Sequence, residues 1–188
     1  MPVHEDKIEF LRYEVGILTL KAALSTRAVD APIYSDACNQ HQRAPIKGAL
    51  RRELRELETA YSYGNISSVD HCEYIAALAN RMSQTYSDSL HNERFRYGIS
   101  QKLINLHLKY LWSIGLVKEP PHCPLDGIVR DLANLNYNWT KSDSQEEYME
   151  AIRALKELAQ PRSLSVWELQ EFRRREQENA RVGHRGLT

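Results

Sequence analysis

Hydrophobic residues recur along most of the chain at intervals of three and four positions, the spacing that places side chains on one face of an α-helix. Near the start of the chain, Ile8, Leu11 and Val15 follow this pattern. No stretch alternates apolar and polar residues for long enough to predict a β-strand. The sequence therefore predicts an all-α fold. The helices expected from periodicity cover residues 5–24, 46–62, 67–90 and 100–115, and another begins near residue 125.

Two capping boxes predict further helix starts later in the chain. Asp143 stands three positions before Glu146, and Ser165 stands three positions before Glu168. The last residues, 182–188, have the composition of a disordered tail. A chain of 188 residues without internal repeats is expected to form a single helical domain over its whole length.

Composition limits the partners and the location that the chain predicts. The 25 basic and 25 acidic residues balance, so overall charge points neither to a membrane surface nor to nucleic acid. No apolar run is long enough for a membrane span or a signal peptide. The separated Cys38, Cys72 and Cys123 fit a reducing cytoplasm and argue against a disulfide scaffold or a multi-cysteine metal cluster. A cytoplasmic protein with no metal and no cofactor is expected.

The helix expected from residue 100 carries a narrow polar stripe on an otherwise apolar surface. Lys102, Asn105, Lys109 and Ser113 are separated by three or four positions, so they lie on one face. Apolar residues cover the other faces, which predicts a mostly buried helix with its stripe towards a cleft. A structural alternative is that both lysines extend from a buried helix into water.

The residues before this helix, 96–101, are expected to form an exposed turn. Gly98 permits a tight bend, which leaves the backbone N–H groups of residues 99–101 pointing outwards at a helix N-terminus, a geometry that binds phosphate. Between residues 81 and 118, six lysines and arginines stand against two acids. The sequence therefore predicts an anion site within a locally positive region.

The order of residues in this part of the chain resembles the helix–hairpin–helix DNA glycosylases, the superfamily of endonuclease III and oxoguanine glycosylase. That family carries a hairpin of the form Leu-Pro-Gly-Val-Gly-x-Lys, an Asn three residues after the Lys, and then Pro-Val-Asp. This chain has Gly98 and Lys102 at the corresponding spacing, then Asn105, and then Asp126 at the end of Pro-Leu-Asp. The resemblance covers residues 96–130.

The resemblance implies a compact helical fold of two lobes with a cleft between them, with the hairpin at residues 96–102 and the catalytic-helix region at 102–130. In that family the hairpin holds a DNA phosphate, the Lys is the Schiff-base nucleophile of members that also cut the strand, and the Asp is the essential carboxylate. Lys102 and Asp126 would then be catalytic. The expected DNA contacts are Arg96, Gly98, Ile99, Ser100, Gln101, Asn105 and Lys109.

The chemistry of base excision gives a reason for a carboxylate at Asp126. Breaking a base-to-sugar bond builds positive charge on the sugar, which a fixed carboxylate stabilises. A position in the first turn of a helix favours the ionised form by roughly 0.3–1 kcal/mol. The structural alternative is that Asp126 simply caps the helix that follows it.

A base that leaves the duplex needs an aromatic surface on which to stack. The candidates, each of which also fits an ordinary core position, are Tyr61, Tyr63, Trp112 and Trp139. The adjacent His122 and Cys123 provide too few ligands for a metal site and no base geometry for a thiol nucleophile. Arg43 and Lys47 could reach a second phosphate, although the basic runs around them fit solvated helix faces.

Two functions follow from these observations. The first is a DNA glycosylase that flips and excises a damaged or modified base from double-stranded DNA, in repair or in antiviral defence against modified phage DNA, either by hydrolysis alone or with an additional lyase activity at Lys102. The second is a non-catalytic helical DNA-binding or interaction protein that retains the hairpin. A monomer is expected in either case. A HEPN-type ribonuclease is excluded, because none of the seven histidines has an Arg five positions before it.

Overall fold

The computed structural model describes residues 2–25 and 28–171, and it confirms the all-α prediction. Within these residues, extended pairing is limited to one isolated bridge between Tyr34 and Leu90. The predicted tail at 182–188 lies outside the described residues. The named helices are α1 (Pro2–Ala23), α2 (Gln40–Tyr63), α3 (Ser68–Tyr86), α4 (Tyr97–Ser113), α5 (Gly127–Leu132) and α6 (Gln145–Ala159), with short 3₁₀ turns η1 (Ser87–Ser89) and η2 (His91–Glu93) after α3.

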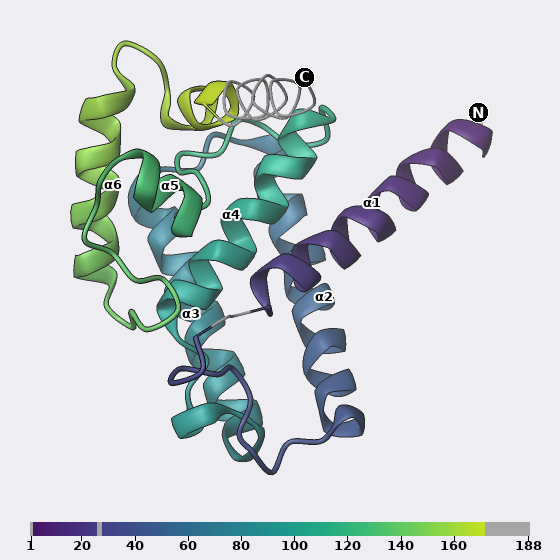
Figure 1. Ribbon diagram of the computed structural model, residues 1–188. Helices are drawn as coiled ribbons and strands as arrows, with labels where there is room; N and C mark the ends of the chain where they lie inside the picture. Colours follow the sequence, from purple (N-terminus) through teal and green to yellow (C-terminus); the bar gives the residue numbers. More distant parts are fainter. Residues whose placement is uncertain (1, 26–27, 172–188) are drawn as a thin grey trace, which may run out of the picture.

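Helix α4 runs through the centre of the molecule (Figure 1). It packs against α1, α2 and α3, and Ile99, Leu103, Leu108 and Leu111 are completely buried. Because apolar residues cover nearly every face of α4, the hydrophobic effect fixes it in the interior, at roughly 1.5–3 kcal/mol for each large side chain. The prediction of a mostly buried helix is confirmed.

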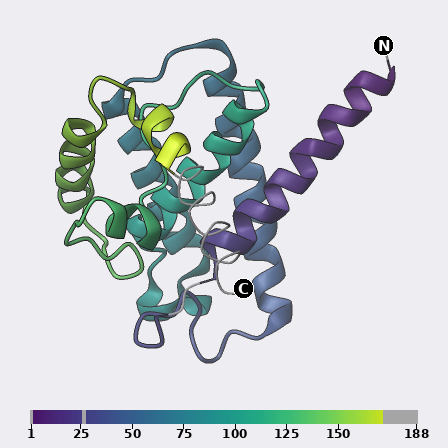
Figure 2. The same ribbon diagram turned by 45° about the horizontal axis from the view of Figure 1, so that its top comes forward.

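Helix α1 extends away from the body of the molecule and joins it at its C-terminal end (Figures 1 and 2). Phe10 and Tyr13, on the extended part, are exposed, whereas Leu20 and Ala23 are buried. The apolar surface at the end of α1 therefore anchors the helix and brings its last residues towards α4.

Helix α2 begins six residues before the start that periodicity predicted. Asn39 is its N-cap: the side-chain oxygen accepts hydrogen bonds from the N–H groups of His41 and Gln42. The Gln42 side chain in turn accepts the N–H of Asn39, which completes a capping box. Pro45, one position before the predicted start, lies in the second turn of the helix. A strong cap therefore outweighs the hydrogen bond that proline removes.

The start of α6 is shifted by one residue from the predicted capping box. Ser144, and not Asp143, is the N-cap, and its hydroxyl oxygen accepts the N–H of Glu147. Asp143 instead accepts the N–H of Tyr97 at 2.7 Å and pairs with Arg94. The carboxylate thereby ties the start of α4 to the start of α6.

Buried apolar residues from α1 through to residue 167 form one core cluster. Residues 164–171 form a further helix, where the Ser163 hydroxyl oxygen, rather than that of the predicted Ser165, accepts the N–H of Val166. The division into two lobes stays a prediction. None of the helices within the described ranges has the length and apolar character needed to cross a membrane.

Candidate functional site

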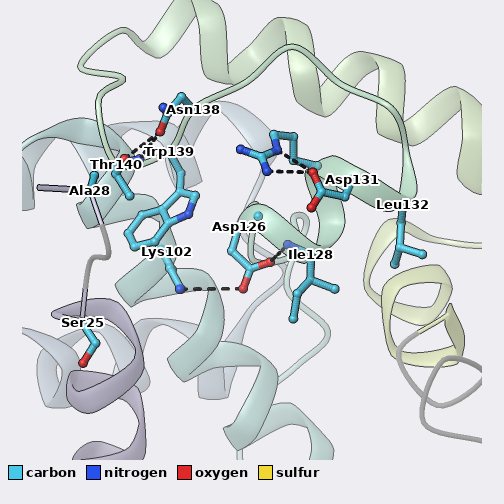
Figure 3. A pocket seen from close by; sticks show the side chains of 12 residues that line it. Ser25, Ala28, Lys102, Asp126, Ile128, Asp131, Leu132, Asn138, Trp139 and Thr140 are labelled. Carbon is cyan, nitrogen blue, oxygen red and sulfur yellow. Dashed lines mark hydrogen bonds and ion pairs between the residues drawn. The ribbon is translucent and has the colours of Figure 1, made fainter. Parts of the chain in front are cut away.

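A pocket of about 760 Å³ contains both residues to which the sequence assigned chemistry (Figure 3). Lys102 enters it from α4, Asp126 stands directly before α5, and Trp139 comes from the segment between α5 and α6. The volume falls within the range of about 300–1,000 Å³ that is usual for ligand sites. The wall is completed by Ser25, Ala28, Ile128, Arg130, Asp131 and Asn138, among others.

Lys102 points into this pocket from the second turn of α4. Its side chain is 11% exposed, and its Nζ lies 3.8 Å from Asp126 Oδ2 and 4.0 Å from the centre of the Trp139 ring. Burial lowers the pKa of Lys102 from its ordinary value, and the Asp126 carboxylate offsets this only in part. A larger fraction of Lys102 is therefore neutral than of a surface lysine, and the neutral amine is the nucleophilic form.

The two oxygens of Asp126 have separate partners. Oδ1 accepts hydrogen bonds from the N–H groups of Ile128 and Val129, at 2.9 and 3.3 Å, so Asp126 is the N-cap of α5. Oδ2 faces Lys102 across the pocket (Figure 3). The capping role that the sequence offered as an alternative therefore exists, and it leaves one oxygen directed at the pocket.

The exposed turn predicted for residues 96–101 is wrong, because α4 already begins at Tyr97. The first two N–H groups of α4 donate to the Asp143 carboxylate and to the Ser142 carbonyl, and the next two donate to the Arg96 carbonyl. A helix N-terminus whose N–H groups are already bonded cannot receive a phosphate. The predicted phosphate contacts that fail for this reason are Gly98, Ile99 and Ser100, all of them buried.

Gly98 serves the fold in a different way from the one predicted. A Cβ at this position would lie 2.0 Å from the carbonyl oxygen of Trp139, which no real Cβ permits. Glycine is therefore required so that the backbone carrying Trp139 can lie directly on α4. This close approach holds the Trp139 ring beside Lys102.

Arg96 fixes the same segment from the other side. Its guanidinium is buried and donates hydrogen bonds to the carbonyls of Thr140, Ala31 and Pro32, at 2.7, 2.8 and 2.9 Å. Its Nε and Nη2 atoms are bonded inside the protein and the residue is buried, so the predicted DNA contact of Arg96 is wrong. Its role is to join the loop before α2 to the pocket wall.

The side chains of Ser100, Gln101 and Asn105 also face the interior. All three are completely buried. The Ser100 hydroxyl donates to the carbonyl of Ile75, and Gln101 exchanges two hydrogen bonds with the backbone of Leu125, at 2.7 and 3.2 Å. Their predicted DNA contacts are therefore wrong. Gln101 instead holds the residue that precedes Asp126.

Gln101 is one end of a buried hydrogen-bond network that the sequence analysis missed. Asn105 Nδ2 donates to Gln101 Oε1 at 3.1 Å and to the Tyr148 hydroxyl at 3.0 Å. The Tyr148 hydroxyl lies 2.9 Å from His122 Nδ1, and Asn105 Oδ1 lies 2.7 Å from His71 Nε2. The network joins residues far apart in the sequence, so no local pattern could have revealed it.

The Leu125 backbone sets the direction of the bonds that run from Gln101 through Asn105 to His71. Gln101 Nε2 donates to the Leu125 carbonyl, so Gln101 Oε1 is left to accept from Asn105 Nδ2. Asn105 Oδ1 must then accept from His71 Nε2. The neutral His71 ring therefore accepts from the Tyr61 hydroxyl through Nδ1. Both histidines are neutral, because burial lowers the pKa of His71 to about 4 and that of His122 to about 2. The network therefore stabilises the position of residue 125 without carrying charge.

Lys109, the other lysine of the polar stripe, is sealed within an ion pair. Its Nζ lies 2.8 and 2.7 Å from the two carboxylate oxygens of Glu168, and the side chain of Glu168 is 8% exposed. Burial raises the pKa of Glu168, and Lys109 opposes that rise. The predicted contact of Lys109 with DNA is wrong, because its charge is committed to Glu168.

The local positive charge between residues 81 and 118 is largely cancelled by acids from elsewhere in the chain. Four of its six cations pair with a carboxylate, and Arg96 is bound to carbonyls. Linear charge counting therefore gave a wrong picture of this surface. The four pairs are Arg81 with Glu53, Arg94 with Asp143, Lys102 with Asp126, and Lys109 with Glu168.

The four candidate stacking residues are separated in the structure. Trp139 lines the pocket. Tyr61 is buried and its hydroxyl bonds to His71, Tyr63 is 88% exposed at the end of α2, and Trp112 packs against the core from α4. The prediction of a base-stacking pocket is therefore wrong for these last three, and Trp139 remains as its candidate.

No metal site forms among the described residues, where no three His, Cys, Asp or Glu side chains come together in a suitable arrangement. Protein-family models, curated proteins and solved structures were each compared with this chain, and none matches it. The function therefore has to be argued from the chemistry of the pocket.

Proposed function

We propose that this protein is a DNA N-glycosylase that excises a damaged or modified base and leaves an abasic site, with a lyase activity at Lys102. One observation carries the proposal: an amine of lowered pKa and a carboxylate lie 3.8 Å apart in the same pocket, beside an aromatic ring. These are the two residues that the resemblance to the glycosylases pairs as nucleophile and carboxylate. The hairpin is not part of the support.

Asp126 stabilises the charge that develops as the base departs. The bond between the base nitrogen and C1′ breaks with its electron pair going to the base, so positive charge appears on C1′ and the ring oxygen. The Oδ2 atom faces the pocket while Oδ1 is held by the N–H groups of α5. A carboxylate fixed in this way needs no reorganisation during the reaction, which is the condition for effective electrostatic stabilisation.

Lys102 supplies the nucleophile. The lone pair of its neutral amine forms a bond to C1′ as the base leaves with the bonding electrons and takes up a proton. Loss of a proton from the nitrogen and opening of the sugar ring then give an imine between Nζ and C1′. Loss of a proton from C2′ of the protonated imine then forms the C2′–C3′ double bond and expels the 3′ phosphate with the bonding electrons, which cuts the strand, and hydrolysis of the imine releases the amine. The lowered pKa of Lys102 favours the first step.

Trp139 provides the surface that receives the flipped base. Extruding a base costs a few kcal/mol, which stacking on an aromatic side chain and contacts to the strand offset. The Trp139 ring lines the pocket and lies over Lys102, so a base stacked there would place its sugar close to the amine. The substrates that fit this chemistry are lesions, mismatched bases and the hypermodified bases of phage DNA, the last consistent with a role in antiviral defence.

The test is release of a base from duplexes that each carry one damaged or hypermodified base, followed by alkali, which cuts at abasic sites. Wild-type protein is expected to produce abasic sites in at least one duplex. Asp126→Asn is expected to reduce the rate by a factor of about 10²–10³. Asparagine is as good an N-cap as aspartate, so α5 should remain intact.

The matched control is the double variant Lys109→Gln/Glu168→Gln, which removes the other buried pair of α4 and keeps hydrogen-bonding groups. It is expected to release the base at close to the wild-type rate. Binding of duplex DNA without release of any base in the panel would contradict the proposal and favour a helical DNA-binding module without chemistry.

A further inference from the structure

A groove of about 310 Å³ lies where the C-terminal part of α1 meets α2, and its charge is of one sign. Four basic residues line it, and none of its lining residues in the described part of the chain is acidic. Because the whole chain has equal numbers of basic and acidic residues, this is a clear local separation of charge. The basic residues are Lys21, Arg43, Lys47 and Arg51.

The helix geometry explains why these charges stand together. Arg43, Lys47 and Arg51 are each four positions apart on α2, so they form one row along a single face. Lys21 joins them from the last turn of α1. Like charges at this spacing weaken an isolated helix, so the row opposes the stability of α2. An arrangement that the fold itself does not favour indicates a ligand of opposite charge.

The groove keeps its charge, unlike the region between residues 81 and 118. Across residues 2–25 and 28–171, no carboxylate forms an ion pair with any of its four basic side chains. Arg43 is oriented by hydrogen bonds to the carbonyl of Cys38 and by the Tyr34 ring, 4.6 Å from its guanidinium carbon. Its positive charge therefore has a fixed orientation, and no carboxylate of the described ranges pairs with it.

The groove and the Lys102 pocket are adjacent. Ser25, directly after α1, lines both of them, and it lies at the edge of the pocket in Figure 3. Arg51 follows Arg43 by eight positions, which is about 12 Å along the helix axis. That length corresponds to between three and four nucleotide steps of about 3.4 Å. A strand that places a base in the pocket can therefore continue along the row.

We propose that the groove between α1 and α2 binds the sugar–phosphate backbone of the DNA strand whose base enters the Lys102 pocket. This inference rests on the proposed function. It assigns the phosphate contacts to residues outside the predicted hairpin, whose N–H groups are bonded within the protein. Lys21, Lys47 and Arg51 contact phosphates, and Arg43 sits at the end of the groove that Tyr34 closes.

The experiment measures binding by fluorescence anisotropy to a duplex that contains a tetrahydrofuran abasic analogue, which cannot react, at a series of salt concentrations. For Lys47→Gln/Arg51→Gln, affinity is expected to fall at least tenfold at low salt. The slope of log K against log salt is expected to become shallower by about 2, one for each lost contact. The control, Lys118→Gln/Arg153→Gln, removes two exposed charges elsewhere and should bind like the wild type.

The outcomes separate this inference from the proposed function, because binding to the analogue requires no chemistry. Wild-type affinity and slope in the groove variant would overturn the groove assignment even if base release is observed. An equal loss in the control variant would show a general charge effect and overturn it as well. Loss of binding confined to the groove variant supports the groove, whether or not the base panel yields a product. Circular dichroism spectra of both variants test whether they are folded, so that a loss of binding can be assigned to the lost charges.

Discussion

Helix α4 carries two lysines that are almost equally buried and that each face a carboxylate, yet their surroundings differ. The side chains of Lys102 and Lys109 are 11% and 14% exposed. Lys109 lies within 2.8 Å of Glu168, whereas Lys102 is 3.8 Å from Asp126 and has a pocket and an aromatic ring beside it. The comparison teaches that burial alone does not prepare an amine for chemistry. The amine also needs a carboxylate that lies beyond close hydrogen-bond distance and a pocket from which a substrate can reach it.

The carboxylates explain the difference between the two lysines. Both oxygens of Glu168 are within reach of Lys109, so that pair is closed. One oxygen of Asp126 is held by the first turn of α5, so the carboxylate cannot close on Lys102. Experiments that affect one lysine and leave the other unchanged can test this difference between the two pairs.

The largest expected difference concerns covalent trapping. The substrate is a duplex that carries the base that the wild type releases, with borohydride as reductant. Lys102→Gln is expected to abolish the protein–DNA adduct, because the glutamine side chain has no amine that could form a reducible imine. Lys109→Gln/Glu168→Gln is expected to give the wild-type amount of adduct. Denaturing gels of labelled DNA measure both. Base release by the wild type without any adduct would assign a hydrolytic mechanism and contradict the role of Lys102.

A second experiment tests the close contact that shapes the Lys102 side of α4. Gly98→Ala is expected to destabilise the protein by more than about 2 kcal/mol, because its Cβ would meet backbone that cannot move aside. Gly48→Ala is the matched control: its Cβ would meet only the end of the Arg52 side chain, at an ordinary contact distance of 3.8 Å, so it should stabilise by about 0.5–1 kcal/mol. Urea unfolding measures both changes. Equal stability of the two variants would show that the Trp139 segment does not lie on α4.

The third experiment concerns pH and uses His107, which lies between the two lysines on α4. Burial lowers the pKa of His107 and of His71 to about 4, and that of His122 to about 2, against 6.5 in the unfolded chain. Stability from keeping these rings neutral is fully present above pH 6.5 and is lost as pH falls towards 4. Each contributes a slope of up to about 1.4 kcal/mol per pH unit.

His107→Leu should remove one such contribution to the pH dependence of stability, because leucine does not titrate. The substitution breaks no hydrogen bond to Nδ1, since this atom has no partner among the described residues. Urea unfolding at pH 7.5, 6.5 and 5.5 gives the slope of each protein. A slope in His107→Leu equal to that of the wild type would mean that His107 is charged in the folded protein. The two lysines are best compared above pH 6.5, where this loss of stability does not interfere.

The smallest expected difference is in chemical labelling of the amines. At pH 8, acetic anhydride is expected to modify Lys102 several times faster than Lys109, because the pKa of Lys102 is lowered and its amine lines a pocket. Asp126→Asn should accelerate the reaction at Lys102, since it removes the charge that raises this pKa. Peptide mass spectrometry measures both rates. Faster labelling of Lys109 would contradict the distinction drawn between the two lysines.

The sequence predicted what local signals can determine. Apolar spacing of three and four residues identified α4 as a buried helix, and Asp126 was recognised as an N-cap candidate from the residues around it. The pairing of Lys102 with Asp126 came from the resemblance, and the structure brings the two together. These features depend on residues close together in the chain or on a known motif.

What the sequence could not give depends on residues that are distant in the chain. Gly98 was interpreted as a turn because nothing nearby shows that the Trp139 carbonyl, forty-one positions later, lies against it. The basic residues between 81 and 118 looked like a phosphate site because their acidic partners, such as Glu53 and Glu168, lie outside that range. The single-sign groove arises from two helices whose contact is a property of the fold.

The division of labour within Asp126 has a mechanical consequence. Since one oxygen accepts hydrogen bonds from backbone N–H groups in the first turn of α5, the position of the acid group is tied to that of this six-residue helix. Ile128 and Leu132 are exposed on this helix, and both line the Lys102 pocket. A substitution that displaces α5 would therefore change the distance between the acid and the amine without touching either group.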